Sequence, residues 1–325
     1  MLPATERLPE VASLISKKQY FVVHAQRQCG KTTAFRALAA EINAKGDAVA
    51  LYCTLESVQM FTDPAVGVPE LAAQIRDAVQ CGASGAFGGL TDAGLKKMVG
   101  EVDLANVVKR TLCVLSECVK KPLVVFFDEV DCLSEATLVS FLRQLRNGRI
   151  TCTVPGTFPV SIAFIGMRNI RAYKMRVRSD GASVGEASPF NVITEAMTLR
   201  LFSEAEMRAL YRQHTDETGQ VFEEEALRKA FDYSRGQPWL VNALARWCVE
   251  KIHHEDYSLP ITGADMDEAK EKLIRERGTH LDSLMERATD PRVRPIVEQV
   301  MLGGMVPEDV PSDDVSYTLD LGLLV

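Results

Sequence analysis

Two hydrophobic patterns alternate along the first two thirds of the chain. Short continuous apolar runs, rich in β-branched and aromatic residues, are typical of strands buried inside a parallel sheet. Between these runs, apolar residues recur at helical spacing, as Phe35, Leu38 and Ile42 do. The patterns predict strands over residues 20–24, 48–56, 123–127, 160–166 and 195–201, and helices over residues 5–18, 68–79, 103–119 and 134–146. This alternation predicts an α/β fold with a doubly wound parallel sheet.

The pattern becomes helical from Ser203 onward. Ser203 and Glu206 have the spacing of a capping box, in which two side chains satisfy backbone N–H groups at the start of a helix. Later helices are predicted over residues 223–235, 238–252, 264–276, 280–288, 292–302 and 313–321. Residues 81–100 and 179–191 are rich in glycine and small residues, and we expect the first of these segments to be a mobile insertion. The predicted domains are an α/β domain over residues 1–201, a helical lid over 202–258 and a C-terminal helical region over 259–325.

The loop after the first predicted strand has the sequence of a phosphate-binding loop. It comprises Ala25, Gln26, Arg27, Gln28, Cys29, Gly30, Lys31, Thr32 and Thr33, and a helical pattern follows it directly. In such a loop, backbone N–H groups at a helix N-terminus point at the β- and γ-phosphates of a nucleotide. Lys31 then neutralises phosphate charge, and the Thr32 hydroxyl is a ligand for Mg²⁺. Ala25 stands where the motif has its first glycine, which weakens the match, and an accidental Gly-Lys-Thr at a helix start is the alternative.

A second motif strengthens this prediction. The apolar run Leu123–Phe127 ends in Asp128 and Glu129, which is a Walker B pattern. At the carboxyl end of a strand, Asp128 can hold the water shell of Mg²⁺ and Glu129 can orient or polarise the attacking water. About 100 residues separate the two motifs, which suits a doubly wound domain. An ordinary turn at a strand end is a poor alternative once both motifs occur together, so the sequence predicts nucleoside triphosphate binding.

Composition indicates an intracellular globular protein. The chain has 325 residues, of which 46% are hydrophobic and 25% charged, so it is long enough for two or three domains. The N-terminus lacks the layout of a signal peptide, and no apolar run is long enough to span a membrane. The eight cysteines include no C-x-x-C pair, and we expect reduced thiols in a cytoplasmic protein. Cys29 is notable because a helix N-terminus favours a thiolate, although packing within the loop is the favoured role.

Charge bears on the choice of partner. The net charge of −7 disfavours a dedicated DNA-binding protein, which usually has a basic excess. Two local basic groups remain: residues 168–178 contain five Arg and Lys residues and no acidic residue, and Arg143, Arg146 and Arg149 follow one another at helical spacing. A solvated face is the favoured interpretation of the first group, and a partner or nucleic-acid surface is the alternative. For Arg143 and Arg146 of the second group, a role as arginine fingers across an oligomer interface is the weaker alternative.

Four motifs together resemble the prokaryotic AAA-type ATPases that belong to, or border on, the STAND class of signal-transduction ATPases. They are residues 25–33, 126–131, 165–168 and 236–238. The resemblance implies an AAA+/ASCE type P-loop fold with a helical lid. It also implies that Arg168 senses the γ-phosphate and that Gly236 and Pro238 lie near the adenine. Arg168 could instead pair with a local carboxylate, and the glycine–proline segment could be an ordinary turn between helices.

The resemblance also extends to the C-terminal region. Related ATPases begin a winged helix at this point, so we expect a partial winged-helix-like region. The chain ends in an apolar strand-like segment, Leu321–Val325, from which we expect either a shortened chain or an effector on a separate protein. The missing sensor 2 arginine is a further point of resemblance, because Trp239 and Leu240 stand where that arginine would be expected.

Three functional hypotheses follow. The first is a slow ATPase, with Glu129, Lys31 and Arg168 as catalytic residues and Mg²⁺ held by Thr32 and Asp128, in which lid closure switches a protein effector. The second is a nucleic-acid loader or motor of Orc-like type that binds DNA through the C-terminal region. The third is a scaffold that binds ATP without turnover. The acidic balance favours the first, a nucleotide-dependent oligomer is compatible with it, and the resemblance favours ATP over GTP.

Overall fold

The computed structural model describes residues 7–81, 87–167, 189–276, 279–304 and 312–324. By its internal contacts the chain divides into two compact units. Among the described residues, an α/β unit comprises those within 7–24 and 32–198, and a helical unit comprises those from Leu199 onward, with the loop Ala25–Lys31 grouped with it. The predicted three-domain division, with its boundary at residue 258, stays a prediction. Within the described ranges, no helix is both long and apolar enough to cross a membrane.

The α/β unit is built on a five-stranded parallel sheet. Its strands are β1(Tyr20–His24), β2(Val49–Thr54), β3(Leu123–Asp128), β4(Ser161–Gly166) and β5(Glu195–Thr198), in the order β2-β3-β4-β1-β5. Each neighbouring pair is parallel, so the carboxyl ends of all five strands lie at one edge of the sheet. Every residue of β3 and β4 is buried, as expected for strands covered on both faces. The predicted strands and the parallel sheet are confirmed.

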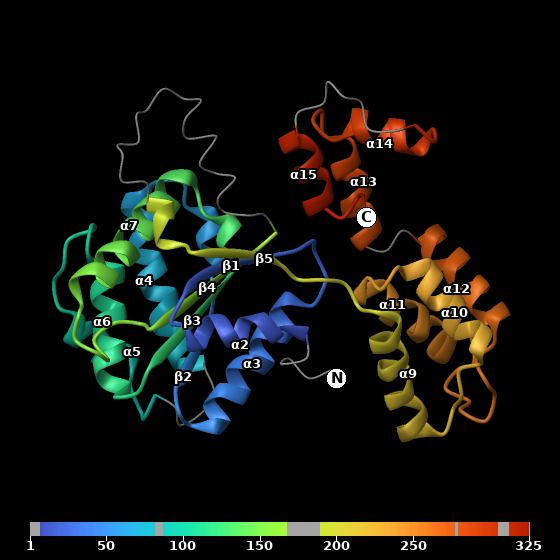
Figure 1. Ribbon diagram of the computed structural model, residues 1–325, viewed down its shortest axis with the longest axis horizontal. Coiled ribbons are helices and arrows are strands. Elements are labelled where there is room, and N and C mark those ends of the chain that lie inside the picture. Colours follow the sequence, from blue (N-terminus) through green and yellow to red (C-terminus); the bar gives the residue numbers. More distant parts are fainter. Residues whose placement is uncertain (1–6, 82–86, 168–188, 277–278, 305–311, 325) are drawn as a thin grey trace. The chain divides into compact units, whose positions relative to one another are not determined.

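Helices cover both faces of this sheet. They are α2(Pro9–Ser16), α3(Lys31–Lys45), α4(Pro64–Cys81), α5(Asp92–Val99), α6(Val107–Val119) and α7(Glu135–Thr151). α2 and α3 lie on one face and α4 to α7 on the other (Figure 1). Phe126 of β3 packs edge-on against Phe35 of α3, whereas the next residue, Phe127, packs edge-on against Phe141 of α7. The alternating directions of strand side chains thus supply two separate aromatic contacts, one on each face.

The expectation of a mobile insertion over residues 81–100 is wrong for its second half. Residues 92–99 form α5, and the Thr91 side chain caps it by accepting the N–H of Gly94. Leu95 and Val99 are buried in the main core, and Asp92 pairs with Arg76 of α4 at 2.8 Å. The glycine content obscured a short amphipathic helix whose cap and apolar stripe are sufficient to define it. Residues 82–86, and most of the predicted loop 179–191, lie outside the described residues, while residues 189–192 form a short 3₁₀ helix.

A buried glutamine fixes the start of α6. Asn106 precedes the helix but provides no side-chain cap. Gln144, which projects from α7 and is 2% exposed, accepts the N–H groups of Val108 and Lys109 at 2.9 and 3.3 Å. Its amide nitrogen donates to the carbonyl of Leu104 at 2.9 Å. One side chain therefore satisfies donors that the helix itself leaves unpaired, and it joins α6 to α7.

The helical unit has its own apolar core. Its helices are α9(Glu204–Thr218), α10(Glu224–Ser234), α11(Pro238–Arg246), α12(Gly263–Glu276), α13(Thr279–Ala288), α14(Arg294–Met301) and α15(Ser312–Asp320). α11 continues as a π-helical segment, Trp247–Ile252. The predicted capping box at Ser203 and Glu206 is present, with both reciprocal hydrogen bonds. Met207, Val241, Leu244 and Met266 are buried together, so α12 shares one core with α9 to α11. The winged-helix-like character of the C-terminal region stays a prediction.

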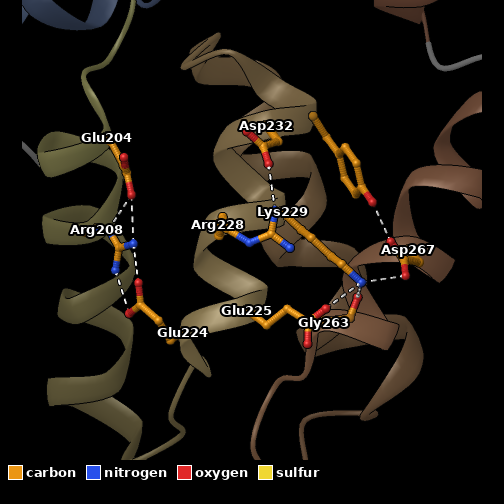
Figure 2. A network of polar contacts seen from close by, with 10 residues as sticks. Glu204, Arg208, Glu224, Glu225, Arg228, Lys229, Asp232, Gly263 and Asp267 are labelled. Atoms are coloured by element: carbon orange, nitrogen blue, oxygen red, sulfur yellow. Dashed lines mark hydrogen bonds and ion pairs between the residues drawn. The ribbon is translucent and has the colours of Figure 1, made fainter.

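Ion pairs join these helices at the surface (Figure 2). Arg208 of α9 binds Glu204 of its own helix and reaches Glu224, the first residue of α10. Lys229 of α10 binds Asp267 of α12 at 2.8 Å, and Tyr233 donates to the same carboxylate at 2.5 Å. Because most of these side chains are exposed, each pair contributes little alone, and their main effect is to fix the register of the three helices.

Candidate phosphate and magnesium site

The phosphate-binding loop connects β1 to α3. Gln28 and Gly30 have positive φ angles of 57° and 83°, which turn the backbone sharply before the helix. The ammonium group of Lys31 is buried and donates to the carbonyl oxygens of Ala25 and Gln26 at 2.7 and 2.9 Å. Lys31 thereby holds the loop together from the inside. Its charge is at the N-terminus of a long helix, where backbone N–H groups already favour an anion.

The remaining loop residues differ in exposure. Ala25 and Cys29 are buried, and the Cys29 sulfur lies 4.0 Å from the Lys31 nitrogen. Arg27, Gln28 and Thr33 are exposed, so their side chains are accessible to a ligand. The buried position of Cys29 agrees with the packing role that the sequence favoured.

The two predicted magnesium ligands meet at the carboxyl edge of the sheet. The Thr32 hydroxyl donates to Oδ2 of Asp128 at 2.6 Å, although the two residues are far apart in sequence. Asp128 is 1% exposed and also accepts the N–H of Glu129 through Oδ1 at 2.9 Å. A hydroxyl and a carboxylate are hard oxygen ligands, which suit Mg²⁺. Among the described residues no group of three or more His, Cys, Asp or Glu could hold a metal ion, so nucleotide oxygens and water would have to complete this site.

Tyr52 is a third member of this cluster that the sequence did not indicate. It lies near the end of β2, beside β3, and its hydroxyl donates to the same oxygen of Asp128. Arg36 of α3 stacks over its ring, with the guanidinium carbon 5.0 Å from the ring centroid. Burial and the neighbouring Asp128 carboxylate raise the pKa of Tyr52, so the hydroxyl remains a proton donor. The strand pattern placed Tyr52 in β2 but could not indicate where its hydroxyl points.

Glu129 has an unusual backbone conformation. Its φ and ψ angles of 57° and 39° place it in the left-handed region, which residues with a side chain rarely adopt. The turn that follows is tied to the end of β4 by Asp131, whose Oδ1 accepts the N–H of Met167 at 3.1 Å. A side chain on Gly166 would meet that oxygen at 2.5 Å, so only glycine allows the approach. Asp131 therefore orients the chain directly before Arg168, which itself lies outside the described residues.

The glycine–proline segment of the helical unit has a clear structural role. Gly236 has a φ of 76°, and a Cβ there would lie 2.0 Å from the carbonyl oxygen of Phe202. The Gly236 carbonyl accepts the N–H of Phe202 at 2.8 Å, which ties the segment entering α9 to the turn between α10 and α11. Gln237 then caps α11 by accepting the N–H of Leu240 at 2.7 Å, with Pro238 in the first turn. The proposed position of Gly236 and Pro238 near the adenine is untested.

Comparison with solved structures identifies the fold. The Walker-type ATPase PABY2304 of Pyrococcus abyssi matches with a TM-score of 0.59 and 15% identity, covering 99% of this chain and 89% of that one. Orc1 of Aeropyrum pernix, solved in complex with DNA, has a TM-score of 0.55 and 14% identity over 93% of this chain and 72% of its own. Cdc6p of Pyrobaculum aerophilum has a TM-score of 0.55 and 12% identity over 99% and 81%. The chain has the P-loop NTPase fold of AAA+ type. No sequence-family model matches it, and no curated protein is significantly similar to it in sequence.

Proposed function

We propose that this chain binds ATP with Mg²⁺, hydrolyses it slowly, and uses the bound nucleotide to control the position of its helical unit. The observation that carries the proposal is the hydrogen bond between Thr32 and Asp128, which joins the phosphate-loop helix to the Walker B strand. The AAA+ type fold supports the same activity, because open α/β sheets bind their ligands at the carboxyl ends of the strands, where Thr32 and Asp128 lie.

Each residue has a defined role in this proposal. Lys31 exchanges its bonds to the Ala25 and Gln26 carbonyls for charge-assisted bonds to phosphate oxygens, which are stronger. Thr32 and Asp128 would hold Mg²⁺, which would supply neutralisation of the phosphate charge. Glu129 orients the attacking water and accepts its proton. Arg168 is proposed as the sensor of the γ-phosphate, and Gly236 and Pro238 as the lid residues near the adenine.

Hydrolysis is tested by the variant Glu129→Gln. Removing the carboxylate is expected to lower the rate of ATP hydrolysis by a factor on the order of 100 while leaving ATP binding intact. Lys31→Ala should instead abolish binding. The matched control is Glu101→Gln, because Glu101 is exposed and outside the site. A native chain that hydrolyses ATP no faster than Glu129→Gln would contradict the ATPase and support a scaffold without turnover.

DNA binding is a second candidate function. It is favoured by the similarity of fold to an Orc1 protein solved in complex with DNA, and disfavoured by the net charge of −7. Binding through phosphates should weaken steeply as salt rises. Titration of the full chain with double-stranded DNA at several salt concentrations tests it, and no binding at low ionic strength would eliminate it.

The main partner that we propose is a protein effector controlled by the switch. An effector is favoured by the resemblance to the STAND class, together with the acidic charge.

A nucleotide-dependent oligomer of this chain is a separate proposal. It is tested by measuring the molecular mass with ADP and with a non-hydrolysable ATP analogue. A change of mass only with the ATP analogue would support a nucleotide-dependent oligomer, and an unchanged mass would contradict it.

A further inference from the structure

Two cysteines of the α/β unit face each other across two helices. The sulfur of Cys113, in the middle of α6, lies 3.3 Å from the sulfur of Cys152, which directly follows α7. A disulfide bond is about 2.05 Å long, so the two atoms need to approach by only roughly 1.3 Å. We propose that Cys113 and Cys152 are a site of reversible oxidation, at which a disulfide joins α6 to α7.

The surrounding contacts hold the two thiols in place. Gln144 of α7 accepts the N–H of Val108, and Asn147 accepts a bond from the Lys109 ammonium at 2.9 Å. The thiol pair lies further along in the same direction, from α6 to the residue that follows α7. Because the partners advance in the same direction along both helices, α6 and α7 run side by side, and the meeting of the two sulfur atoms follows from this packing.

The two thiols differ in access. Cys152 is partly exposed, whereas Cys113 is 6% exposed. Burial, followed by the hydrogen bond to Cys152, raises the pKa of Cys113 to about 12. An oxidant therefore reaches Cys152 first, and Cys113 resolves the oxidised intermediate. The step by Cys113 should accelerate as pH rises, because the thiolate is the attacking form.

The oxidant class is a peroxide, and the reaction is balanced in two steps. The Cys152 sulfur attacks hydrogen peroxide, the O–O bond breaks, and a sulfenic acid and one water are formed. The Cys113 sulfur then attacks the Cys152 sulfur, the S–O bond breaks, and the hydroxyl leaves as water with the proton of Cys113. The two thiols together lose two protons and two electrons, and the peroxide is reduced to two waters. A thiol reductant reverses the bond.

The position of the pair predicts the consequence of oxidation. Cys152 directly follows α7, and Arg149 in the last turn of that helix stacks over the ring of Tyr20, the first residue of β1, at 4.3 Å, so the pair lies toward the amino ends of the strands. Asp128 and Thr32 lie at the carboxyl edge. The bond would close a loop that contains β3 and thereby restrict the unfolded chain. Oxidation is therefore expected to raise the thermal midpoint without abolishing nucleotide binding.

The test is peptide mapping of the full chain after treatment with hydrogen peroxide. Cys81 is exposed, so a Cys81→Ser background removes the thiol that is most accessible for links between chains among the described cysteines. The expected product is one linked pair of peptides that contains Cys113 and Cys152. Its mass is lower by two hydrogen atoms than the summed mass of the two separate peptides, and dithiothreitol should restore the separate peptides. The linked pair should be absent in the variant Cys152→Ser. It should be retained in Cys118→Ser, which is a control on α6, the helix of Cys113.

Two results would overturn the inference. One is oxidation of other thiols under these conditions with no link between Cys113 and Cys152. The other is a link that forms only after urea has unfolded the chain, since the bond would then not depend on the packing of α6 and α7. Mapping of the background chain alone distinguishes these outcomes, so the test does not depend on the folding of Cys152→Ser.

Discussion

At the scale of single residues, one buried carboxylate organises the carboxyl edge of the sheet. Asp128 accepts hydrogen bonds from Thr32, from Tyr52 and from the N–H of Glu129. A carboxylate that is 1% exposed needs such donors, because an unpaired buried charge is strongly unfavourable. Tyr52 is therefore a positioning residue for Asp128.

Replacing Tyr52 with Phe should expose this role. The variant keeps the ring over which Arg36 stacks but removes the donor to Asp128. We expect the free energy of unfolding to fall by about 2 kcal/mol, the magnitude of a hydrogen bond to a charged group. Urea unfolding of Tyr52→Phe, Asp128→Asn and the double variant measures the coupling between the two side chains. If the two changes are simply additive, Tyr52 does not act through Asp128.

Gly236 offers a second test at the scale of one residue. Gly236→Ala places a methyl group 2.0 Å from the Phe202 carbonyl at a positive φ, so backbone must move. Gly219 is a matched control, because it ends α9 at a φ of 82° with no atom within 4 Å of the added methyl. We expect Gly219→Ala to cost about 1 kcal/mol and Gly236→Ala at least about 2 kcal/mol more. Equal losses in urea unfolding would show that the contact with Phe202 does not constrain the turn.

At the scale of elements, the helices begin at defined caps. Several of them start with a side chain that accepts a backbone N–H group of the first turn: Asp63 for α4, Thr91 for α5, Ser134 for α7, Ser203 for α9, Gln237 for α11 and Thr262 for α12. The Ser203 cap is strengthened because Arg200 binds Glu206 through both of its carboxylate oxygens. The cap therefore includes a charge, and its contribution to stability depends on pH.

Acid should remove the contribution of Glu206 to the free energy of unfolding. Its bond to Arg200, opposed in part by burial, lowers the carboxyl pKa from 4.5 to about 2. A lowered pKa in the folded state stabilises the protein above the pKa of the unfolded state, and this stabilisation is lost as pH falls from about 4.5 to about 2. At pH 7 we expect Glu206→Gln to cost about 1 kcal/mol, the size of a typical cap. Unfolding measured between pH 7 and 3 should show this difference shrinking below about pH 4.5, whereas a constant difference would contradict the assignment.

At the scale of the whole molecule, the sequence predicted most elements but few of their side-chain partners. Buried runs such as Leu123–Phe127 identify a strand because they remain apolar on both faces, and the capping box at Ser203 is visible as a local pattern. Contacts between distant segments leave no such pattern. Tyr52 with Asp128, Gln144 with the start of α6, and Cys113 with Cys152 each depend on how elements pack. α5 was missed because glycines around a short helix predicted a loop.

The positions of the two tryptophans allow the proposed switch to be measured. Trp239 and Trp247 are the chain's two tryptophans, and both line one cavity of about 450 Å³ in the helical unit. Their fluorescence therefore reports on that unit, while the residues proposed to bind phosphate and Mg²⁺ follow β1 and β3. If nucleotide controls the helical unit, a non-hydrolysable ATP analogue with Mg²⁺ should change the tryptophan emission, and ADP should change it less.

The variant Lys31→Ala should abolish this change in emission, because it removes the charge that binds phosphate. Lys45→Ala, at the other end of α3, is the matched control and should retain it. Emission that does not respond to the analogue, in a chain shown by equilibrium dialysis to bind it, would contradict the switch but leave ATP binding intact. A response that persists in Lys31→Ala would instead show that the nucleotide binds elsewhere. The response of the two tryptophans to bound nucleotide thus becomes a measurable difference between two lysines on one helix.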